Sequence, residues 1–309
     1  MCAIMARMAH AKSPYIGRFA PSPTGPLHFG SLVAALGSYL QARTNHGQWH
    51  LRMEDLDTPR CMPGMADNIL HTLERFGFEW DGAVVYQSQR LPAYRAALDQ
   101  LQAAGMVYGC ACTRREIADS SLHGIEDTVY PGTCRDGVPP GRTVRAQRVR
   151  TDTTPICFDD LLQGRICQRL QDDLGDFVVL RADGIFAYQL AVVVDDAQLG
   201  VTEVVRGADL LASTPRQIYL QNLLHLPTPC YVHLPVAVNA IGQKLSKQTN
   251  AAALNPLNPL PELCRAMEFL SHPVPDEVGT LDEFWGWAGF AWSPQQRLRT
   301  GSETGSKVV

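Results

Sequence analysis

The architecture of this chain can be inferred first from one stretch, Arg18-Phe-Ala-Pro-Ser-Pro-Thr-Gly-Pro-Leu-His-Phe-Gly-Ser31. Residues 15–20 read as a short buried strand, but the prolines and glycine that follow cannot lie in a central strand and therefore predict a loop. Apolar residues then recur with helical spacing from about 29 to 43. A loop that leads from a strand into a helix presents free N–H groups at the helix start, where an anion such as a phosphate binds favourably. His28 could donate a further hydrogen bond to that phosphate, and Gly30 would let it approach the backbone closely; the alternative is a proline-rich surface turn with an exposed histidine.

Strands and helices alternate along most of the chain, which favours an α/β fold with an open, Rossmann-like parallel sheet. Further strands are expected at about 49–54, 83–86, 177–180, 191–195, 201–206 and 231–238, and helices at about 66–76, 91–104 and 214–224. The alternation breaks between about 110 and 175, where Cys, Arg, Pro and Gly become frequent, and we interpret this span as an inserted module. The predicted division is a first half of a nucleotide-binding domain at 14–109, the inserted module at 110–175, a second half at 176–254 and a small helical appendix at 255–299. Residues 1–13 and 300–309 are expected to be disordered.

Composition and charge exclude several classes of protein. The 309 residues are 45% apolar and 19% charged, which is ordinary for a globular chain. No apolar run approaches the roughly 18 residues of a transmembrane helix, and residues 1–13 make a poor signal peptide, so we expect a cytoplasmic protein with no membrane partner. The formal net charge of −4 argues against a basic coat for long nucleic acids, but it is compatible with a local RNA contact.

A second phosphate-binding element is predicted far downstream, at Lys244-Leu-Ser-Lys-Gln248. Two lysines bracket a serine in a short loop, and flexible ammonium groups there could follow the charge of a triphosphate as it reacts. The motif is weak by itself, because lysines at this spacing are common on protein surfaces. It gains weight only together with the loop that precedes the first helix.

Together the two elements resemble the HIGH and KMSKS signatures of the class I aminoacyl-tRNA synthetases. The sequences at 17–25, 52–57, 194–196 and 200–207 resemble the glutamyl branch, and the resemblance covers roughly residues 15–250. Only about 60 residues follow the Lys244 loop, too few for the anticodon-binding region of a full glutamyl-tRNA synthetase. The chain is therefore similar to the truncated paralogues of this branch, the glutamyl-queuosine tRNA(Asp) synthetases. Ser31 and Gln248 depart from the generic signatures.

The resemblance implies ATP-dependent activation of L-glutamate to glutamyl-adenylate, with Mg²⁺ accompanying the ATP, and transfer of glutamate to queuosine at the wobble position of tRNA(Asp). It also implies that the activation step proceeds without tRNA, and we expect a monomer. The implied catalytic residues are His28, Lys244 and Lys247; the implied ATP contacts are His28, Gly30, Ser246 and Lys247; the implied glutamate contacts are Arg18, Phe19, Ala20, Pro21, Ser22, Glu54, Tyr188 and Arg206. The alternatives are a short glutamyl-tRNA synthetase that charges a tRNA 3′ end and a non-catalytic module that binds glutamate or RNA.

Some of these side chains have a plainer interpretation. Arg18 and Arg206 suit the two carboxylates of glutamate, because a guanidinium binds a carboxylate with two hydrogen bonds. Arg206 could instead form an ion pair, Glu54 a capping salt bridge, and Tyr188 part of the core. The candidate partners are Asp195, Asp196 or Asp209 for Arg206, and Arg52 or Arg60 for Glu54.

Three of the nine cysteines are clustered at Cys110, Cys112 and Cys134, and could close a tetrahedral zinc site of structural type. His123 is the easy fourth ligand chemically, whereas the resemblance implies Tyr130, a weaker ligand because a phenol deprotonates only near pH 10. Three buried free thiols are the alternative. The other cysteines have no partner spacing and are interpreted as ordinary small apolar residues: Cys2, Cys61, Cys157, Cys167, Cys230 and Cys264. Five arginines between 135 and 150 could contact RNA phosphates or form a solvated face.

Overall fold

The computed structural model describes residues 14–120, 129–238, 252–294 and 306–308. His123 and the predicted loop residues Lys244, Ser246 and Lys247 lie outside the described residues, as does the predicted disorder at 1–13. Residues 306–308 fall in the predicted disordered tail, but the structure pairs them as a strand, β12 (Ser306–Val308), with β11 (Val236–Val238).

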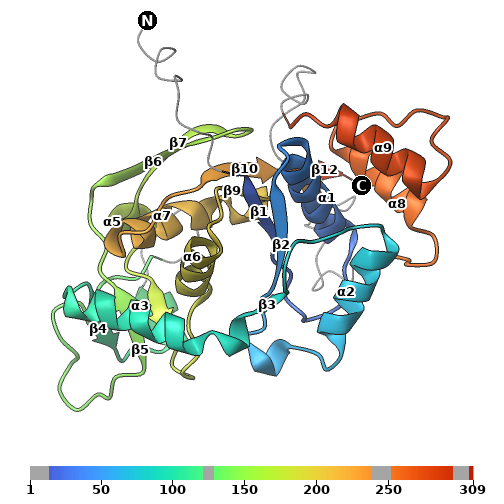
Figure 1. Cartoon of the computed structure of the whole chain (residues 1–309). Coiled ribbons are helices and arrows are strands. Elements are labelled where there is room, and N and C mark those ends of the chain that lie inside the picture. The colour runs from blue at the N-terminus through green and yellow to red at the C-terminus, as the bar shows by residue number, and fades with distance from the viewer. Residues whose placement is uncertain (1–13, 121–128, 239–251, 295–305, 309) are drawn as a thin grey trace, which may run out of the picture.

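A largely parallel sheet forms the centre of the molecule and confirms the predicted α/β fold (Figure 1). One part contains the parallel strands β1 (Ile16–Phe19), β2 (Gln48–Met53) and β3 (Val85–Tyr86), in the order β1-β2-β3. The other part has the order β7-β6-β10-β9, with β6 (Pro155–Asp160), β10 (Cys230–Leu234) and β9 (Glu203–Gly207) parallel and β7 (Gly164–Arg169) antiparallel at the edge. The two parts meet where the N–H of Thr202, just before β9, donates to the carbonyl of Ile16 in β1 at 2.9 Å. The order of strands reverses at this point, and open α/β sheets bind ligands at the carboxyl ends of the strands beside such a reversal.

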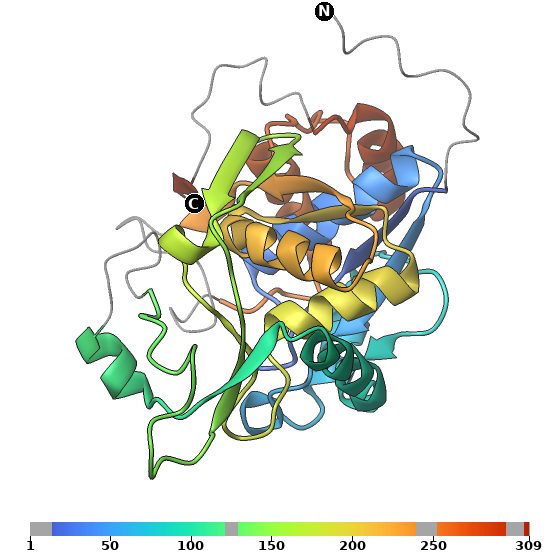
Figure 2. The same cartoon turned by 90° about the vertical axis from the view of Figure 1, so that its left-hand side faces the viewer.

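Helices cover both faces of this sheet. On one side α3 (Leu91–Ala103), α6 (Tyr188–Leu199) and α7 (Thr214–Leu223) lie side by side (Figure 2). On the other side lies α1 (Phe29–Thr44), with α2 (Met65–Arg75) further out. Successive side chains of a strand point to opposite faces, so Val204 of β9 enters the core under α6 and α7 while Val205 enters the core around α1.

Two predicted strands differ from the structure. The strand expected at 191–195 is the middle of helix α6, which is buried on nearly all sides, so that its apolar run shows no helical periodicity. The single strand expected at 231–238 is divided into β10 and β11, which belong to different sheets. Pro235 stands at the division, and proline cannot donate a hydrogen bond to a neighbouring strand.

A smaller antiparallel sheet carries the cysteine cluster. It consists of β4 (Val107–Cys110), β5 (Ala146–Val149) and β8 (Val178–Leu180), with the short helices α4 (Arg114–Ser120) and α5 (Leu170–Asp173) nearby in the sequence. Hydrogen bonding does not follow the predicted boundary at residue 175. Strands β6 and β7 precede this boundary but pair with the central sheet, whereas β8 follows it but pairs with β5.

The interpretation of two cysteines as unpaired is wrong. Cys157 of β6 and Cys167 of β7 lie directly opposite each other in the antiparallel hairpin and form a disulfide. Their spacing of 10 residues carries no signal by itself. The pair could be foreseen only once the register of the hairpin, which turns before Gly164, is known.

Two helices pack beside α1 at the end of the described chain (Figure 1). They are α8 (Pro259–Phe269) and α9 (Leu281–Ala291). The ring of Phe269 meets the ring of Phe29 edge-on at 5.7 Å, and the indole N–H of Trp285 donates to the carbonyl of Phe76 at 3.1 Å. Within the part of the chain that the structure describes, every helix is too short or too polar to cross a bilayer.

Candidate active site

A cavity of about 610 Å³ opens at the carboxyl ends of β1 and β9, where the strand order reverses. It is lined by every described residue that the sequence predicted to contact glutamate or ATP: Arg18, Phe19, Ala20, Pro21, Ser22, His28, Gly30, Glu54, Tyr188 and Arg206. The predicted contacts that meet in this cavity include Arg18 and Arg206, which are 188 positions apart in the chain. The fold thus brings the predicted contacts together, while the role of each side chain stays a prediction.

His28 forms the cap at the start of α1, and His28, Gly30 and Ser31 line the cavity there. Its Nδ1 accepts a hydrogen bond from the N–H of Ser31 at 3.3 Å, and the Ser31 hydroxyl accepts one from the N–H of His28 at 2.7 Å. Because Nδ1 accepts, a neutral His28 ring carries its proton on Nε2 and can donate it to a ligand. Ser31, which departs from the generic signature, therefore has a structural role: it fixes the orientation and tautomer of His28.

Buried ion pairs surround one end of the cavity. The Nε of Arg18 lies 3.1 Å from Asp196 Oδ1, and the Nη1 of Arg52 lies 2.5 Å from the same oxygen. Arg52 Nη2 also contacts Glu54 Oε1 at 3.2 Å, so the capping partner considered for Glu54 is present although Glu54 still lines the cavity. Burial opposes ionisation of Asp196, but the attraction of Arg18 and Arg52 outweighs it and lowers the pKa of Asp196. For Glu54 burial outweighs the same two arginines, and its pKa is raised.

Sequence reasoning missed Arg52 as a functional residue, although a signal was available. Arg52 lies in β2 between Leu51 and Met53, and a charged residue inside an otherwise apolar buried strand needs an internal partner. That partner is supplied by helix α6, whose Asp195 and Asp196 point inward. Asp195 also accepts hydrogen bonds from the hydroxyl of Tyr94 and the Nε of Arg90, so it is fully engaged in the core.

Arg206 has a different environment from the other cavity arginines. Its Nε donates to His233 Nε2 at 3.1 Å, and its Nη2 donates to Thr214 Oγ1 at 2.9 Å and to the carbonyl of Leu210 at 3.4 Å. Its Nη1 is buried and has no hydrogen-bond partner among the described residues. Among the residues that the structure describes, no carboxylate forms an ion pair with Arg206. Asp196, one of the partners considered for Arg206, pairs with Arg18 and Arg52 instead. A buried guanidinium without a counter-ion favours binding of an anionic ligand.

Tyr188 is the first residue of α6 and is half buried at the cavity wall. Burial, and next the nearby charge of Glu54, raise the pKa of the Tyr188 hydroxyl. The hydroxyl therefore stays protonated at neutral pH and can donate a hydrogen bond to a carboxylate.

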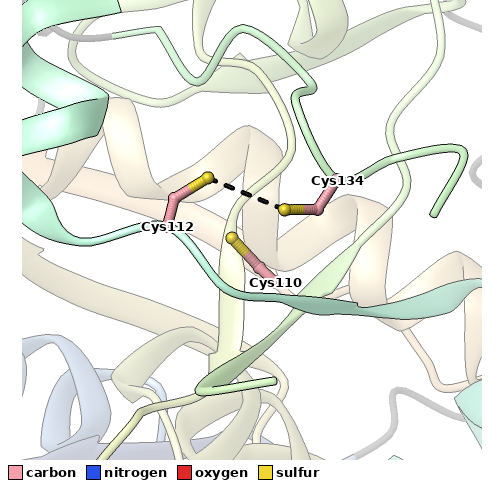
Figure 3. Close-up of side chains that lie close together, drawn as sticks. All are labelled: Cys110, Cys112 and Cys134. Carbon is pink, nitrogen blue, oxygen red and sulfur yellow. Dashed lines mark hydrogen bonds between the residues drawn. The ribbon is translucent and has the colours of Figure 1, made fainter. Parts of the chain in front are cut away.

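The three clustered cysteines converge on one point (Figure 3). The sulfurs of Cys112 and Cys134 are 3.6 Å apart, and the hydroxyl of Tyr130 lies 3.4 Å from the sulfur of Cys110 and 3.7 Å from that of Cys112. Zinc–sulfur bonds of 2.3 Å in a tetrahedron would separate two sulfurs by about 3.8 Å, and a sulfur and an oxygen by about 3.5 Å. These separations are compatible with a tetrahedral zinc ion held by the three sulfurs, and the Tyr130 hydroxyl lies beside them, so that Tyr130 as the fourth ligand stays a prediction.

Four of the five arginines between 135 and 150 are engaged with residues of the small sheet and its neighbours, and one of them, Arg150, lies over the ring of Tyr108 at 4.9 Å from its centroid. Arg135 pairs with Asp176 at 2.6 Å, and Arg142 pairs with Glu116 at 2.8 Å. Arg148 lies over the ring of Tyr130 at 3.9 Å from its centroid. These contacts favour a structural role for the four arginines over a free RNA-binding face.

Comparison with known proteins places this site in a family. A model for the catalytic domain of the class I tRNA synthetases (E and Q) matches residues 16–256. The Glutamyl-Q tRNA(Asp) synthetase of Dechloromonas aromatica is 60% identical over 294 residues, covering 93% of this chain and 98% of that protein. The protein of the same name from Aromatoleum aromaticum is 61% identical over 285 residues, covering 92% and 90% of the two chains. The solved glutamate-tRNA synthetase of Elizabethkingia anophelis superposes with a TM-score of 0.76 at 25% identity, and the match covers 92% of this chain but 66% of that one.

Proposed function

The chain belongs to the class I tRNA synthetases of the glutamate and glutamine (E and Q) type and is a ligase of that kind, and we propose that it activates L-glutamate with ATP and transfers the glutamate to queuosine in tRNA(Asp). One observation carries the first half of this proposal: the start of helix α1 and the uncompensated guanidinium of Arg206 share a single cavity. The names of relatives that match nearly the whole chain support the second half.

In the activation step an oxygen of the glutamate α-carboxylate attacks the α-phosphorus of ATP. The new carboxylate–phosphorus bond forms as the bond to the β-phosphate oxygen breaks, and pyrophosphate leaves with the bonding electron pair. A carboxylate at neutral pH needs no general base, so the enzyme acts by positioning and by stabilising charge. His28, the helix start at Gly30, and the Lys244–Lys247 loop with Ser246 would hold the phosphates. Mg²⁺ would arrive bound to ATP and neutralise part of the phosphate charge.

The cavity offers a matching group for each charge of glutamate. The Arg206 guanidinium would bind the side-chain carboxylate, and Arg18 would approach the other carboxylate. Glu54 would pair with the ammonium group, while Ser22 and Tyr188 would add hydrogen bonds. Phe19, Ala20 and Pro21 form the adjoining wall.

In the second step a hydroxyl oxygen of the queuosine cyclopentenediol would attack the carbonyl carbon of glutamyl-adenylate. A carbon–oxygen ester bond forms, and AMP leaves with the electrons of the broken carbon–oxygen bond. The hydroxyl proton passes to solvent or to the phosphate of AMP.

A structural zinc ion held by Cys110, Cys112, Tyr130 and Cys134 is part of the proposal. Such an ion would cross-link the end of β4 to residues 130–134 and keep the small sheet in place. The zinc ion would lie in the cysteine module, outside the cavity, and would take no part in the activation or transfer of glutamate.

The experiment that tests the function compares glutamate charging of tRNA(Asp) with and without queuosine. We expect labelled glutamate to attach only to the tRNA that contains queuosine. Equal charging of both tRNAs would identify a glutamyl-tRNA synthetase acting at the 3′ end. Absence of glutamate-dependent exchange between ATP and pyrophosphate would identify a non-catalytic module.

A further inference from the structure

A buried chain of hydrogen bonds leads from the turn after β6 to the cavity. Asp160 ends β6, His233 lies in β10 and Arg206 lies in β9, so the three residues stand near the carboxyl ends of three neighbouring parallel strands. Their exposed fractions are 4%, 0% and 5%. Of the three, Arg206 alone lines the cavity.

The hydrogen bonds fix the protonation of His233. A guanidinium nitrogen can only donate, so His233 Nε2, which lies 3.1 Å from Arg206 Nε, must be an unprotonated acceptor. The neutral ring then carries its proton on Nδ1, which lies 2.6 Å from Asp160 Oδ2 and donates to it. The Thr214 hydroxyl closes the arrangement, at 2.9 Å from Arg206 Nη2 and 3.2 Å from His233 Nε2.

Asp160 is itself held rigidly. Its Oδ1 accepts hydrogen bonds from the N–H groups of Leu162 at 3.0 Å and Gln163 at 2.8 Å, both in the turn between β6 and β7. Burial opposes ionisation of Asp160, but the hydrogen bond from His233 and those from the N–H groups of Gln163 and Leu162 outweigh it and lower the pKa of Asp160. A charged, immobile carboxylate thus holds the imidazole in one tautomer and one orientation.

The chemical identity of the group that holds Arg206 matters for ligand binding as much as the position of that group. A carboxylate beside Arg206 would satisfy its geometry but would also neutralise its charge, as Asp196 does for Arg18. A neutral imidazole fixes the guanidinium while leaving its full positive charge for a ligand. Arg206 lines the cavity, and its buried Nη1 has no hydrogen-bond partner among the described residues.

We propose that Asp160 and His233 are positioning residues that orient Arg206 toward the side-chain carboxylate of the amino-acid substrate and so set the preference for glutamate over a neutral amino acid of the same shape. This inference rests on the proposed function of the cavity. It adds two residues that do not touch the substrate and that no sequence motif of the chain singled out.

The test measures binding of L-glutamate by calorimetry and glutamate-dependent ATP–pyrophosphate exchange for the full chain and its variants. His233→Phe removes the acceptor and should raise the Kd and KM for glutamate about ten- to a hundredfold while the KM for ATP stays unchanged, because a hydrogen bond to a charged group is lost. His233→Gln offers an amide oxygen near the position of Nε2 and should recover part of the loss. Asp160→Asn should act in the same direction as His233→Phe.

Two further variants separate positioning from general damage. In an Arg206→Lys background His233→Phe should cause no additional rise in the KM for glutamate, because residues that act through one another are not additive. His272→Phe removes another buried imidazole, which is bonded to backbone groups of Leu270 and Ser293 and does not line the cavity, and is the matched control with unchanged glutamate affinity. The ratio of kcat/KM for glutamate to that for glutamine should fall in His233→Phe and not in His272→Phe.

Each outcome has one meaning. Additive effects in the double variant, an equal rise in the KM for ATP and glutamate, or unchanged glutamate affinity in soluble, folded His233→Phe would overturn the positioning role. A wild-type protein that binds glutamate without catalysing exchange would overturn the proposed activity, and the positioning role would then be decided by the Kd values. A wild-type protein that does not bind glutamate would overturn both.

Discussion

Arg52 is the buried cation that contacts three carboxylates near the cavity. Its side chain has no exposed surface and contacts Asp196 at 2.5 Å, Glu54 at 3.2 Å and Asp195 at 3.7 Å. Removing one member of a buried ion pair leaves its partners charged and without compensation. We therefore expect Arg52→Met to lower the free energy of unfolding by about 3–5 kcal/mol, measured by urea denaturation. The exposed pair of Arg165 and Asp159 is the control, since Arg165→Met should cost less than about 1 kcal/mol; similar losses in the two variants would contradict this prediction.

The burial of His233 leads us to predict that the stability of the folded protein depends on pH. Burial, and next the charge of Arg206, lower its pKa below the ordinary value of 6.5, although Asp160 and Asp209 act in the opposite direction. As the pH falls below about 6.5 the unfolded chain gains a proton at His233 that the folded chain does not, so the folded state loses stability by at most about 1.4 kcal/mol per pH unit. This loss ends once the pH has passed the lower pKa of the folded state.

The measurement is urea unfolding of wild type and His233→Gln at about pH 7.5 and pH 5.5. Wild type should lose more stability than the variant between the two conditions, because the variant has no group to titrate at this position. A greater loss in the variant would mean that His233 is charged in the folded protein. Its acceptor role toward Arg206 would then be wrong.

The elements differ in how far the sequence alone predicts them. Helices with one apolar face, such as α2 and α3, were predicted to within one or two residues, because their spacing records which side is buried. Helix α6 was predicted as a strand because it is buried on most sides and its apolar run has no period. The disulfide of β6 and β7 and the bonds of His233 join residues whose proximity follows from sheet register, which no local pattern records. The cavity residues could be named in advance because two loop motifs and a family resemblance identified them.

The cysteine cluster permits a prediction about the small sheet. Cys110 ends β4, and Cys112 and Cys134 lie in the segments that follow, so a bound zinc ion would tie loops of different parts of the module together. We expect about one zinc per chain by elemental analysis and its loss in Cys112→Ser. Tyr130→Phe retains the three thiolates and should therefore still bind zinc. The binding should be weaker than in the wild type, because the fourth ligand is lost. Cys264→Ser alters a free cysteine in α8 and should leave the zinc content unchanged; equal zinc in Cys112→Ser and Cys264→Ser would exclude the site.

At the scale of the whole molecule, the cavity is built by the central sheet and its flanking helices alone. Among the described residues, its lining comes from residues between 18 and 34, from Glu54, Arg60 and Tyr188, and from residues within 205–210 and 234–237. Neither the cysteine module nor the pair α8 and α9 contributes. The residues that we propose to contact glutamate are already assembled around buried ion pairs in the described part of the chain, so on this proposal no further domain is needed to form the contacts. Activation of glutamate should therefore require only ATP and glutamate.

We expect glutamate-dependent ATP–pyrophosphate exchange without tRNA, with added tRNA(Asp) changing the rate by less than about threefold. Glutamine in place of glutamate should give little exchange, because Arg206 would then be buried against a neutral amide and keep an uncompensated charge. His28→Ala should slow the exchange by roughly ten- to a hundredfold, through loss of a hydrogen bond to the reacting phosphates. Exchange that appears only when tRNA is added would show that the cavity is completed by RNA, and the positions of Arg18 and Glu54 in the free protein would then not be those of the active enzyme.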